Sequence, residues 1–169
     1  HHYYYQNDRQ IDCYAVVRYW AGKEATPDDL IEAMIEADQD YNIEEFYLPH
    51  DQPGIAKTAR ATLSASKVRK AKIQVFAGIN MVSRFLNSGR LKLLKRAGHE
   101  LAWKELSGYR WKEDREGNFL DEPFKQDDHY PDAIRYLIAS RHLRDDLIKN
   151  EGEPEKNAPV PKQFSLYDL

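Results

Sequence analysis

The sequence predicts an α/β fold, and three observations support that prediction. Short apolar stretches of strand character alternate with stretches of helical period, in the order strand, strand, helix, strand, helix, with more helices after them. The length of 169 residues is that of one ordinary domain with room for a hydrophobic core. The aromatic content, with 11 Tyr, 6 Phe and 3 Trp, is typical of a folded chain rather than a disordered one.

The first two predicted elements are strands. Residues 3–5 and 11–20 are rich in aromatic and β-branched side chains, and the polar residues 7–10 between them indicate a turn. Along the second strand the side chains of both faces are mostly apolar, which is typical of a strand covered on both sides. We therefore expect residues 11–20 to form a central strand.

A helix with a well-defined start follows. Thr26-Pro27-Asp28-Asp29 places a capping threonine, a proline and two acids in the order that a helical N-terminus favours. The helix should end near Tyr41-Asn42, and an apolar stripe predicts its buried face: Leu30, Ile31, Met34 and Ile35. Residues 45–48 then predict a short strand, closed by the turn residues 49–54.

The middle of the chain predicts two helices and a brief strand. Residues 55–63 have helical character, whereas residues 64–70 fit either a short strand or a basic loop. The apolar residues between Ile73 and Phe85 follow a helical period, although Gly78 is a poor helix former. Residues 90–94 fit a short strand.

The last third predicts a helix over 100–111, a charged loop over 112–127 and a final helix over about 128–149. Four side chains of the first helix are available for packing: Leu101, Trp103, Leu106 and Tyr109. The prolines after residue 150 indicate a tail. We therefore expect one domain over residues 1–149 and a flexible tail over 150–169.

Composition excludes several classes of protein. The single cysteine, Cys13, excludes a disulfide framework within the chain and a cysteine-rich zinc site. No apolar run approaches the roughly 18–20 residues of a membrane span, and no signal peptide is visible. No phosphate-binding loop of the G-x-x-x-x-G-K-[ST] type occurs.

Charge is segregated along the chain, although the net charge is only −3. Residues 24–51 are strongly acidic, and residues 52–99 contain basic residues but no acidic one. The basic residues of that stretch are Lys57, Arg60, Lys67, Arg69, Lys70, Lys72, Arg84, Arg90, Lys92, Lys95 and Arg96. Such a stretch favours contact with phosphate groups. The alternative is a surface on which the acidic and basic halves neutralise each other.

The most informative segment is Gln126-Asp127-Asp128-His129-Tyr130-Pro131-Asp132, at the start of the final helix. Asp128 and Asp132 are one helical turn apart and therefore lie on the same side. Clustered carboxylates repel one another, so they are tolerated where solvent screens them or where a divalent cation binds them. The other interpretation is an acidic helix cap, since aspartate is favoured in a first turn.

Four segments carry a resemblance to a known family: Phe46-Tyr47-Leu48-Pro49-His50-Asp51, Ala77-Gly78-Ile79-Asn80, Glu105-Leu106-Ser107-Gly108-Tyr109-Arg110-Trp111, and Pro123-Phe124-Lys125-Gln126-Asp127-Asp128-His129 with its continuation through Asp132-Ala133-Ile134-Arg135-Tyr136. The chain resembles the nuclease domain of the large terminase subunit of tailed bacteriophages over about residues 3–143. That domain has an RNase H-like fold related to RuvC resolvases. The resemblance thus implies a mixed sheet flanked by helices.

The resemblance implies a site for two Mg²⁺ or Mn²⁺ ions. The matching positions are Asp51, Asp128 and Asp132, with Asp127 as an adjacent candidate ligand. Residues expected to contact the DNA backbone are Lys57, Arg60, Lys67, Arg69, Lys70 and Lys72. His129 fits either an outer-shell or phosphate-facing group of the site, or a histidine that packs at the start of the helix. Arg135 fits either DNA contact or pairing with an acidic neighbour. Arg110, Trp111 and Tyr109 are expected to be structural.

The function implied is metal-dependent cleavage of double-stranded viral DNA during genome packaging, in the cytoplasm of an infected bacterium. The implied partners are the DNA, the ATPase domain of the terminase, the small terminase subunit and the portal, and no membrane. Two alternatives remain. One is a catalytically incomplete DNA-binding or docking module of a packaging motor, and the other is an RNase H-like nuclease of resolvase or integrase type.

One departure from the family pattern supports the first alternative. The first, central strand of the family ends in an Asp-x-Gly element that supplies a metal ligand, and no such element occurs here. Residues 3–5 and 11–20 match the second and third strands of that fold better. The first strand is therefore predicted to be missing or atypical.

Overall fold

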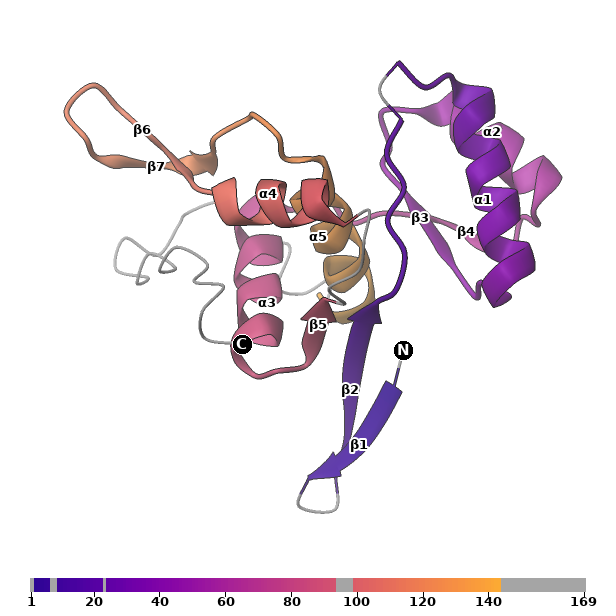
Figure 1. Ribbon diagram of the computed structural model, residues 1–169, viewed down its shortest axis with the longest axis horizontal. Coiled ribbons are helices and arrows are strands. Elements are labelled where there is room, and N and C mark those ends of the chain that lie inside the picture. Colours follow the sequence, from indigo (N-terminus) through magenta and orange to yellow (C-terminus); the bar gives the residue numbers. More distant parts are fainter. Residues whose placement is uncertain (1, 7–8, 23, 94–98, 144–169) are drawn as a thin grey trace. The chain divides into compact units, whose positions relative to one another are not determined.

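The computed structural model describes residues 2–6, 9–22, 24–93 and 99–143, which belong to two compact units (Figure 1). The first unit combines His1–Tyr19 with Gln74–Leu169, and the second is Trp20–Ile73. The predicted tail, residues 7–8 of the first turn, and Lys95 and Arg96 lie outside the described residues.

The first unit contains a three-stranded sheet in the order β1-β2-β5. Strands β1 (His2–Gln6) and β2 (Arg9–Val16) are antiparallel, and β5 (Leu91–Leu93) runs parallel to β2. The central position predicted for the second strand is confirmed. Its predicted end at residue 20 is wrong, because the last pairing joins Val16 to Leu93 and the chain beyond has no partner strand among the described residues.

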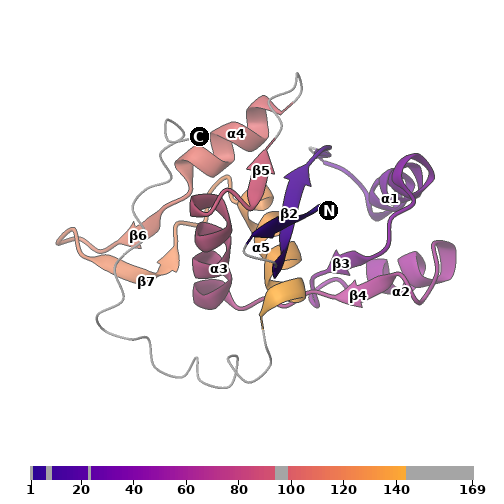
Figure 2. The same cartoon turned by 90° about the horizontal axis from the view of Figure 1, so that it is seen from below.

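Three helices pack beside this sheet: α3 (Val75–Asn87), α4 (Glu100–Gly108) and α5 (His129–His142). Figure 2 shows α3 and α5 side by side, and α5 also contacts α4. The buried core joins β2, β5 and all three helices and consists of Tyr14, Val82, Phe85, Leu91, Ala102, Leu106, Tyr130, Ile134 and Ile138. The final helix begins where the sequence predicts. Its predicted end near residue 149 is wrong, because the helix ends at His142 and Leu143 has an extended backbone.

The prediction that residues 112–127 form a charged loop is wrong. Helix α4 ends at Gly108, and the next residues form a hairpin of β6 (Trp111–Glu113) and β7 (Phe119–Pro123). Its turn is held by the Asp114 carboxylate, which accepts hydrogen bonds from the backbone N–H groups of Glu116 and Asn118. Such aspartate turns compete locally with helix and are not visible from hydrophobic period.

The second unit contains α1 (Pro27–Tyr41), β3 (Phe46–Leu48), α2 (Pro53–Thr62) and β4 (Val68–Lys70). Strands β3 and β4 are parallel. Of the two structures left open for residues 64–70, a short strand forms over Val68–Lys70, and residues 64–67 before it form a turn. The Thr26 hydroxyl accepts a hydrogen bond from the Asp29 N–H, which confirms the predicted cap. The core of this unit consists of Ile31, Met34, Ala59 and Val68.

The observed architecture is therefore a mixed α/β fold, as predicted, with its described strands in three small sheets rather than one. Among the described residues, none of the helices combines the length and apolar character that a membrane span requires.

Candidate functional site

The start of α5 holds the two carboxylates that the sequence singles out. Asp128 immediately precedes the helix, and its carbonyl accepts the N–H of Asp132 at 2.9 Å. The Asp128 side chain makes no capping hydrogen bond to the helix. The acidic-cap interpretation is therefore wrong for Asp128, and its carboxylate is available for other contacts.

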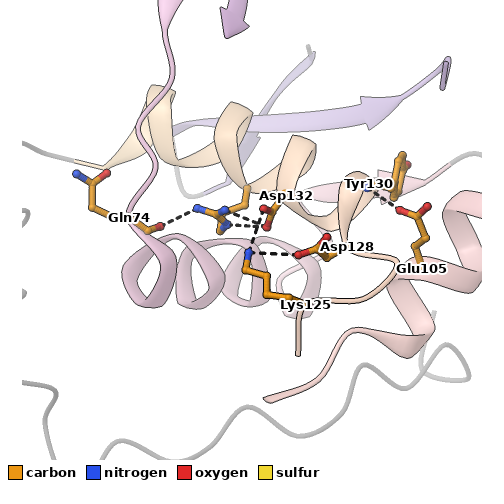
Figure 3. A network of polar contacts seen from close by, with 7 residues as sticks. Gln74, Glu105, Lys125, Asp128, Tyr130 and Asp132 are labelled. Atoms are coloured by element: carbon orange, nitrogen blue, oxygen red, sulfur yellow. Dashed lines mark hydrogen bonds and ion pairs between the residues drawn. The ribbon is translucent and has the colours of Figure 1, made fainter. Parts of the chain in front are cut away.

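Both carboxylates share one cation, the ammonium group of Lys125, and Asp132 has a second one in Arg135 (Figure 3). Lys125 Nζ lies 3.2 Å from Asp128 Oδ2 and 3.6 Å from Asp132 Oδ2. The aspartate side chains are only 16% and 17% exposed, whereas the lysine side chain is 60% exposed. A positive charge placed between the two carboxylates offsets their mutual repulsion.

Arg135 fixes the other oxygen of Asp132. Its Nη2 and Nε lie 2.9 Å and 3.2 Å from Asp132 Oδ1, and its Nη1 donates to the carbonyl oxygen of Gln74 at 3.2 Å. The guanidinium also lies over the ring of Tyr136, 4.7 Å from its centroid. The arginine is 3% exposed. Of the two roles open for Arg135 from sequence, the structure shows pairing with an acidic neighbour.

Glu105 of α4 holds the first turn of α5, and sequence reasoning missed it. Its Oε2 accepts the backbone N–H of Tyr130 at 2.7 Å, and the residue is only 4% exposed. A signal was present, because Ala102, Glu105, Leu106 and Tyr109 recur at helical spacing and form the buried face of this segment. The prediction that Leu101 packs inward is wrong, since that side chain is 45% exposed.

Tyr109 places a buried hydroxyl near the carboxylates. No hydrogen bond of good geometry reaches its oxygen from the described residues, although the Arg135 guanidinium interacts with it. Burial raises the pKa of this phenol, the negative charges of Asp132 and Asp128 raise it further, and the Arg135 charge opposes them. The pKa of neighbouring Tyr130 is raised to about 12, chiefly by burial and secondarily by Tyr19. Both phenols therefore stay protonated at neutral pH.

Of the other predicted site residues, Asp127 and His129 flank Asp128 in the chain, and Asp51 is part of the other unit. Asp51 belongs to the second unit, in a turn that follows β3 and precedes α2. Asp127 has a left-handed backbone with φ of 52° and forms none of the ion pairs of the α5 start. His129 is the first residue of α5. Within the ranges that the structure describes, no three His, Cys, Asp or Glu side chains are grouped to hold a metal.

The six lysines and arginines predicted to contact DNA all lie in the second unit, and they differ in whether an acidic residue pairs with them. Lys67 and Arg69 pair with acids of their own unit, at 2.7 Å from Asp38 and 3.3 Å from Glu45. Three others are exposed or partly exposed and form no ion pair in the described part of the chain: Lys57, Arg60 and Lys70. Lys72 follows β4 in the same unit.

The α5 start has the donor set of a hard divalent cation. Mg²⁺ is bound in proteins through one or two carboxylates, with water and phosphate oxygens completing its shell. Asp128 and Asp132 supply two carboxylates that already share one positive charge. The residues present therefore fit a Mg²⁺ or Mn²⁺ ion, and the ammonium of Lys125 marks where a cation is accommodated.

Comparison with known proteins identifies the family of the chain. The model of the Terminase RNAseH like domain matches residues 23–140. The chain belongs to this family. Its fold is accordingly RNase H-like, and the terminase is favoured over a resolvase or an integrase. No curated protein sequence matches the chain.

Solved structures of a large terminase from a thermophilic bacteriophage are similar to the chain. The complex with ATP-gamma-S shares 26% identity, covers 70% of this chain and has a TM-score of 0.59. The complex with ADP shares 25% identity, covers 72% of this chain and has a TM-score of 0.61. The chain spans about 30% of the length of those terminases.

Proposed function

We propose that the chain is a nuclease module that hydrolyses phosphodiester bonds of double-stranded viral DNA with Mg²⁺ or Mn²⁺ during genome packaging. The observation that carries the proposal is the α5 start, where Asp128 and Asp132 of a terminase RNase H-like domain share one cation. Both side chains are mostly buried, so the charges are poorly screened by solvent. A divalent ion would take the place of the exposed Lys125 ammonium between them, while Arg135 keeps its contact with Asp132 Oδ1.

Each proposed residue has a role that follows from its chemistry. Asp128 and Asp132 would bind metal, and Asp51 would complete the site, with Asp127 as an adjacent ligand. Bound divalent ions activate water and stabilise the leaving oxygen of a phosphodiester. Lys57, Arg60 and Lys70 would bind the DNA backbone through its phosphates, and Lys72 and His129 are further candidates.

The proposal extends to the partners of a packaging motor. The similar phage proteins are large terminases that bind ATP-gamma-S and ADP in their solved structures, and they are much longer than this chain. We therefore propose that the module works beside an ATPase domain, with the small terminase subunit and the portal as assembly partners. The proposed place of action is the cytoplasm of the infected host.

The test is cleavage of supercoiled plasmid by the purified chain with Mn²⁺. Wild type is expected to nick or linearise the plasmid, and Asp132→Asn and Asp51→Asn to abolish cleavage. Asp28→Asn, an exposed aspartate in the first turn of α1, is the matched control and should cleave as wild type does. Circular dichroism of each variant separates loss of chemistry from loss of fold.

Retardation of DNA without cleavage would favour a DNA-gripping or docking module instead. The specific observation in its favour is the sequence, which lacks the family's Asp-x-Gly element. In that case Asp132→Asn should leave DNA affinity unchanged, while Lys57→Ala and Arg60→Ala should reduce it and weaken its salt dependence.

A further inference from the structure

Gly78 lies buried in α3, at the point where this helix meets the stem of Arg135. A Cβ atom at position 78 would lie 2.7 Å from Arg135 Cγ, 3.0 Å from Arg135 Cδ and 3.7 Å from Ala139 Cβ. Real Cβ atoms do not approach a neighbour as closely as the first of these distances, so one side chain would have to move. The contact involves the stem of the arginine and not its flexible end.

A glycine inside a helix costs roughly 0.5–1 kcal/mol relative to alanine. Position 78 offers no compensating turn or positive φ, because it lies within Val75–Asn87. The absence of a side chain at position 78 therefore leaves space beside α3. The space is filled by the arginine stem, which leads the guanidinium toward Asp132.

All three nitrogens of the guanidinium have partners. Two of its nitrogens contact Asp132 Oδ1, and the third donates to the Gln74 carbonyl where α3 begins. Because a guanidinium is planar, these contacts define the orientation of the whole group. Asp132 then has one oxygen held by Arg135 and the other, Oδ2, turned to the cation that it shares with Asp128.

We propose that Gly78 and Arg135 are positioning residues for Asp132 as a metal ligand. Gly78 admits the arginine stem, and Arg135 holds Oδ1 so that Oδ2 is presented toward Asp128. The inference rests on the proposed function, since it concerns how Asp132 meets the metal. Groups that orient a ligating side chain typically change metal affinity by about 10–100-fold when they are removed.

The experiment measures binding of Mn²⁺ to the full chain, by the electron paramagnetic resonance signal of free Mn²⁺. Gly78→Ala is expected to weaken binding about 10-fold or more, although it alters no charged atom. Gly54→Ala is the matched control, because a Cβ atom at this helical glycine would have nothing within 4 Å, and the variant should bind Mn²⁺ as wild type does. Arg135→Lys should also weaken binding, since a lysine cannot hold Oδ1 with two nitrogens.

A double variant separates positioning from general damage to the helix pair. In an Arg135→Ala background the colliding Cγ and Cδ atoms are gone, and the next-nearest atom to a new methyl group is Ala139 Cβ, at an ordinary 3.7 Å. Adding Gly78→Ala to that background should therefore leave Mn²⁺ affinity unchanged, a non-additive result diagnostic of coupling. Circular dichroism confirms that each compared protein is folded.

The outcomes distinguish the two proposals. Mn²⁺ binding that depends on Asp132 but is equal in wild type, Gly78→Ala and Arg135→Lys would overturn the positioning role alone. Should Gly78→Ala fail to fold, Arg135→Lys decides by the same criterion. Binding by wild type that Asp132→Asn leaves unchanged would overturn the proposed metal site, and the positioning role with it.

Discussion

The contact between Glu105 and the first turn of α5 supports a quantitative prediction. The Glu105 carboxylate accepts the Tyr130 N–H at 2.7 Å and stands in for the capping side chain that Asp128 does not supply. A hydrogen bond to a buried charged acceptor contributes about 1.5–3 kcal/mol. A negative charge at a helix N-terminus contributes about 0.3–1 kcal/mol more, and up to about 2 where it is partly buried.

Glu105→Ala removes both contributions and leaves the Tyr130 N–H without its acceptor. We expect the free energy of unfolding to fall by about 2–4 kcal/mol. Glu105→Gln retains an acceptor oxygen but loses the charge, so its cost should be only about 1 kcal/mol. The assay is urea denaturation monitored by circular dichroism. The slope of the unfolding free energy against urea concentration should be the same in all variants, which would show that the substitution does not change the compactness of the unfolded state.

A second readout reports on the same bond directly. Amide hydrogen exchange at Tyr130 should accelerate in Glu105→Ala and much less in Glu105→Gln. Glu32→Ala, which removes an exposed helical glutamate from α1, is the matched control and should change stability little. If Glu105→Ala were no more destabilising than Glu32→Ala, the carboxylate would not be holding the start of α5.

Three further predictions follow from individual contacts. Tyr109→Phe should keep or raise stability, because it removes a buried hydroxyl to which no described residue makes a hydrogen bond of good geometry. Lys67→Met should lower the free energy of unfolding by up to about 1 kcal/mol and change DNA affinity less than Lys57→Met, since Lys67 is already paired. Thr26→Ala should lower stability by about 1 kcal/mol at neutral pH, with a smaller effect in acid.

The acid dependence of the last variant has a defined sign. The Thr26 hydroxyl, and then its N–H, donate to Asp29 and hold the pKa of that carboxyl below its ordinary 3.8. A carboxyl with a depressed folded pKa stabilises the folded state above its unfolded pKa, and this contribution is lost as pH falls through the folded value. Thermal melts at neutral pH and in strong acid, below the folded pKa of Asp29, measure it.

Each of these predictions has a contradicting result. A clear loss of stability in Tyr109→Phe would mean that the phenol has a partner. Equal losses of DNA affinity in the Lys67 and Lys57 variants would mean that pairing with helix α1 does not keep Lys67 from the DNA. A Thr26→Ala effect that is the same at both pH values would mean that the Thr26 hydroxyl does not stabilise the Asp29 carboxylate.

The sequence predicts local structure where a single short segment makes all the contacts that determine it. Thr26-Pro27-Asp28-Asp29 predicts the start of α1, because the cap is made by residues three apart. Helical spacing likewise places Asp128 and Asp132 on one side of α5. Hydrophobic period did not reveal the β6–β7 hairpin, whose turn depends on hydrogen bonds to Asp114.

Contacts between segments far apart in the chain could not be predicted from the sequence. The acceptor that holds Arg135 is a backbone carbonyl 61 residues earlier in the chain, and no side-chain pattern marks a carbonyl. Gly78 looked only like a weakness in a helix, whereas its missing Cβ admits that arginine. The pairing of Asp51 with Asp128 and Asp132 stays a prediction from the family resemblance.

The most direct test of the proposed metal site is anomalous diffraction from crystals of the chain soaked in Mn²⁺. The proposal predicts an anomalous peak bound to carboxylate oxygens of Asp128 and Asp132, with the Lys125 ammonium moved away from its position between them. The same soak of Asp132→Asn crystals should lose that peak. A peak that persists without the Asp132 carboxylate, or ordered Mn²⁺ only at other carboxylates, would contradict the assignment of the metal site to the start of α5.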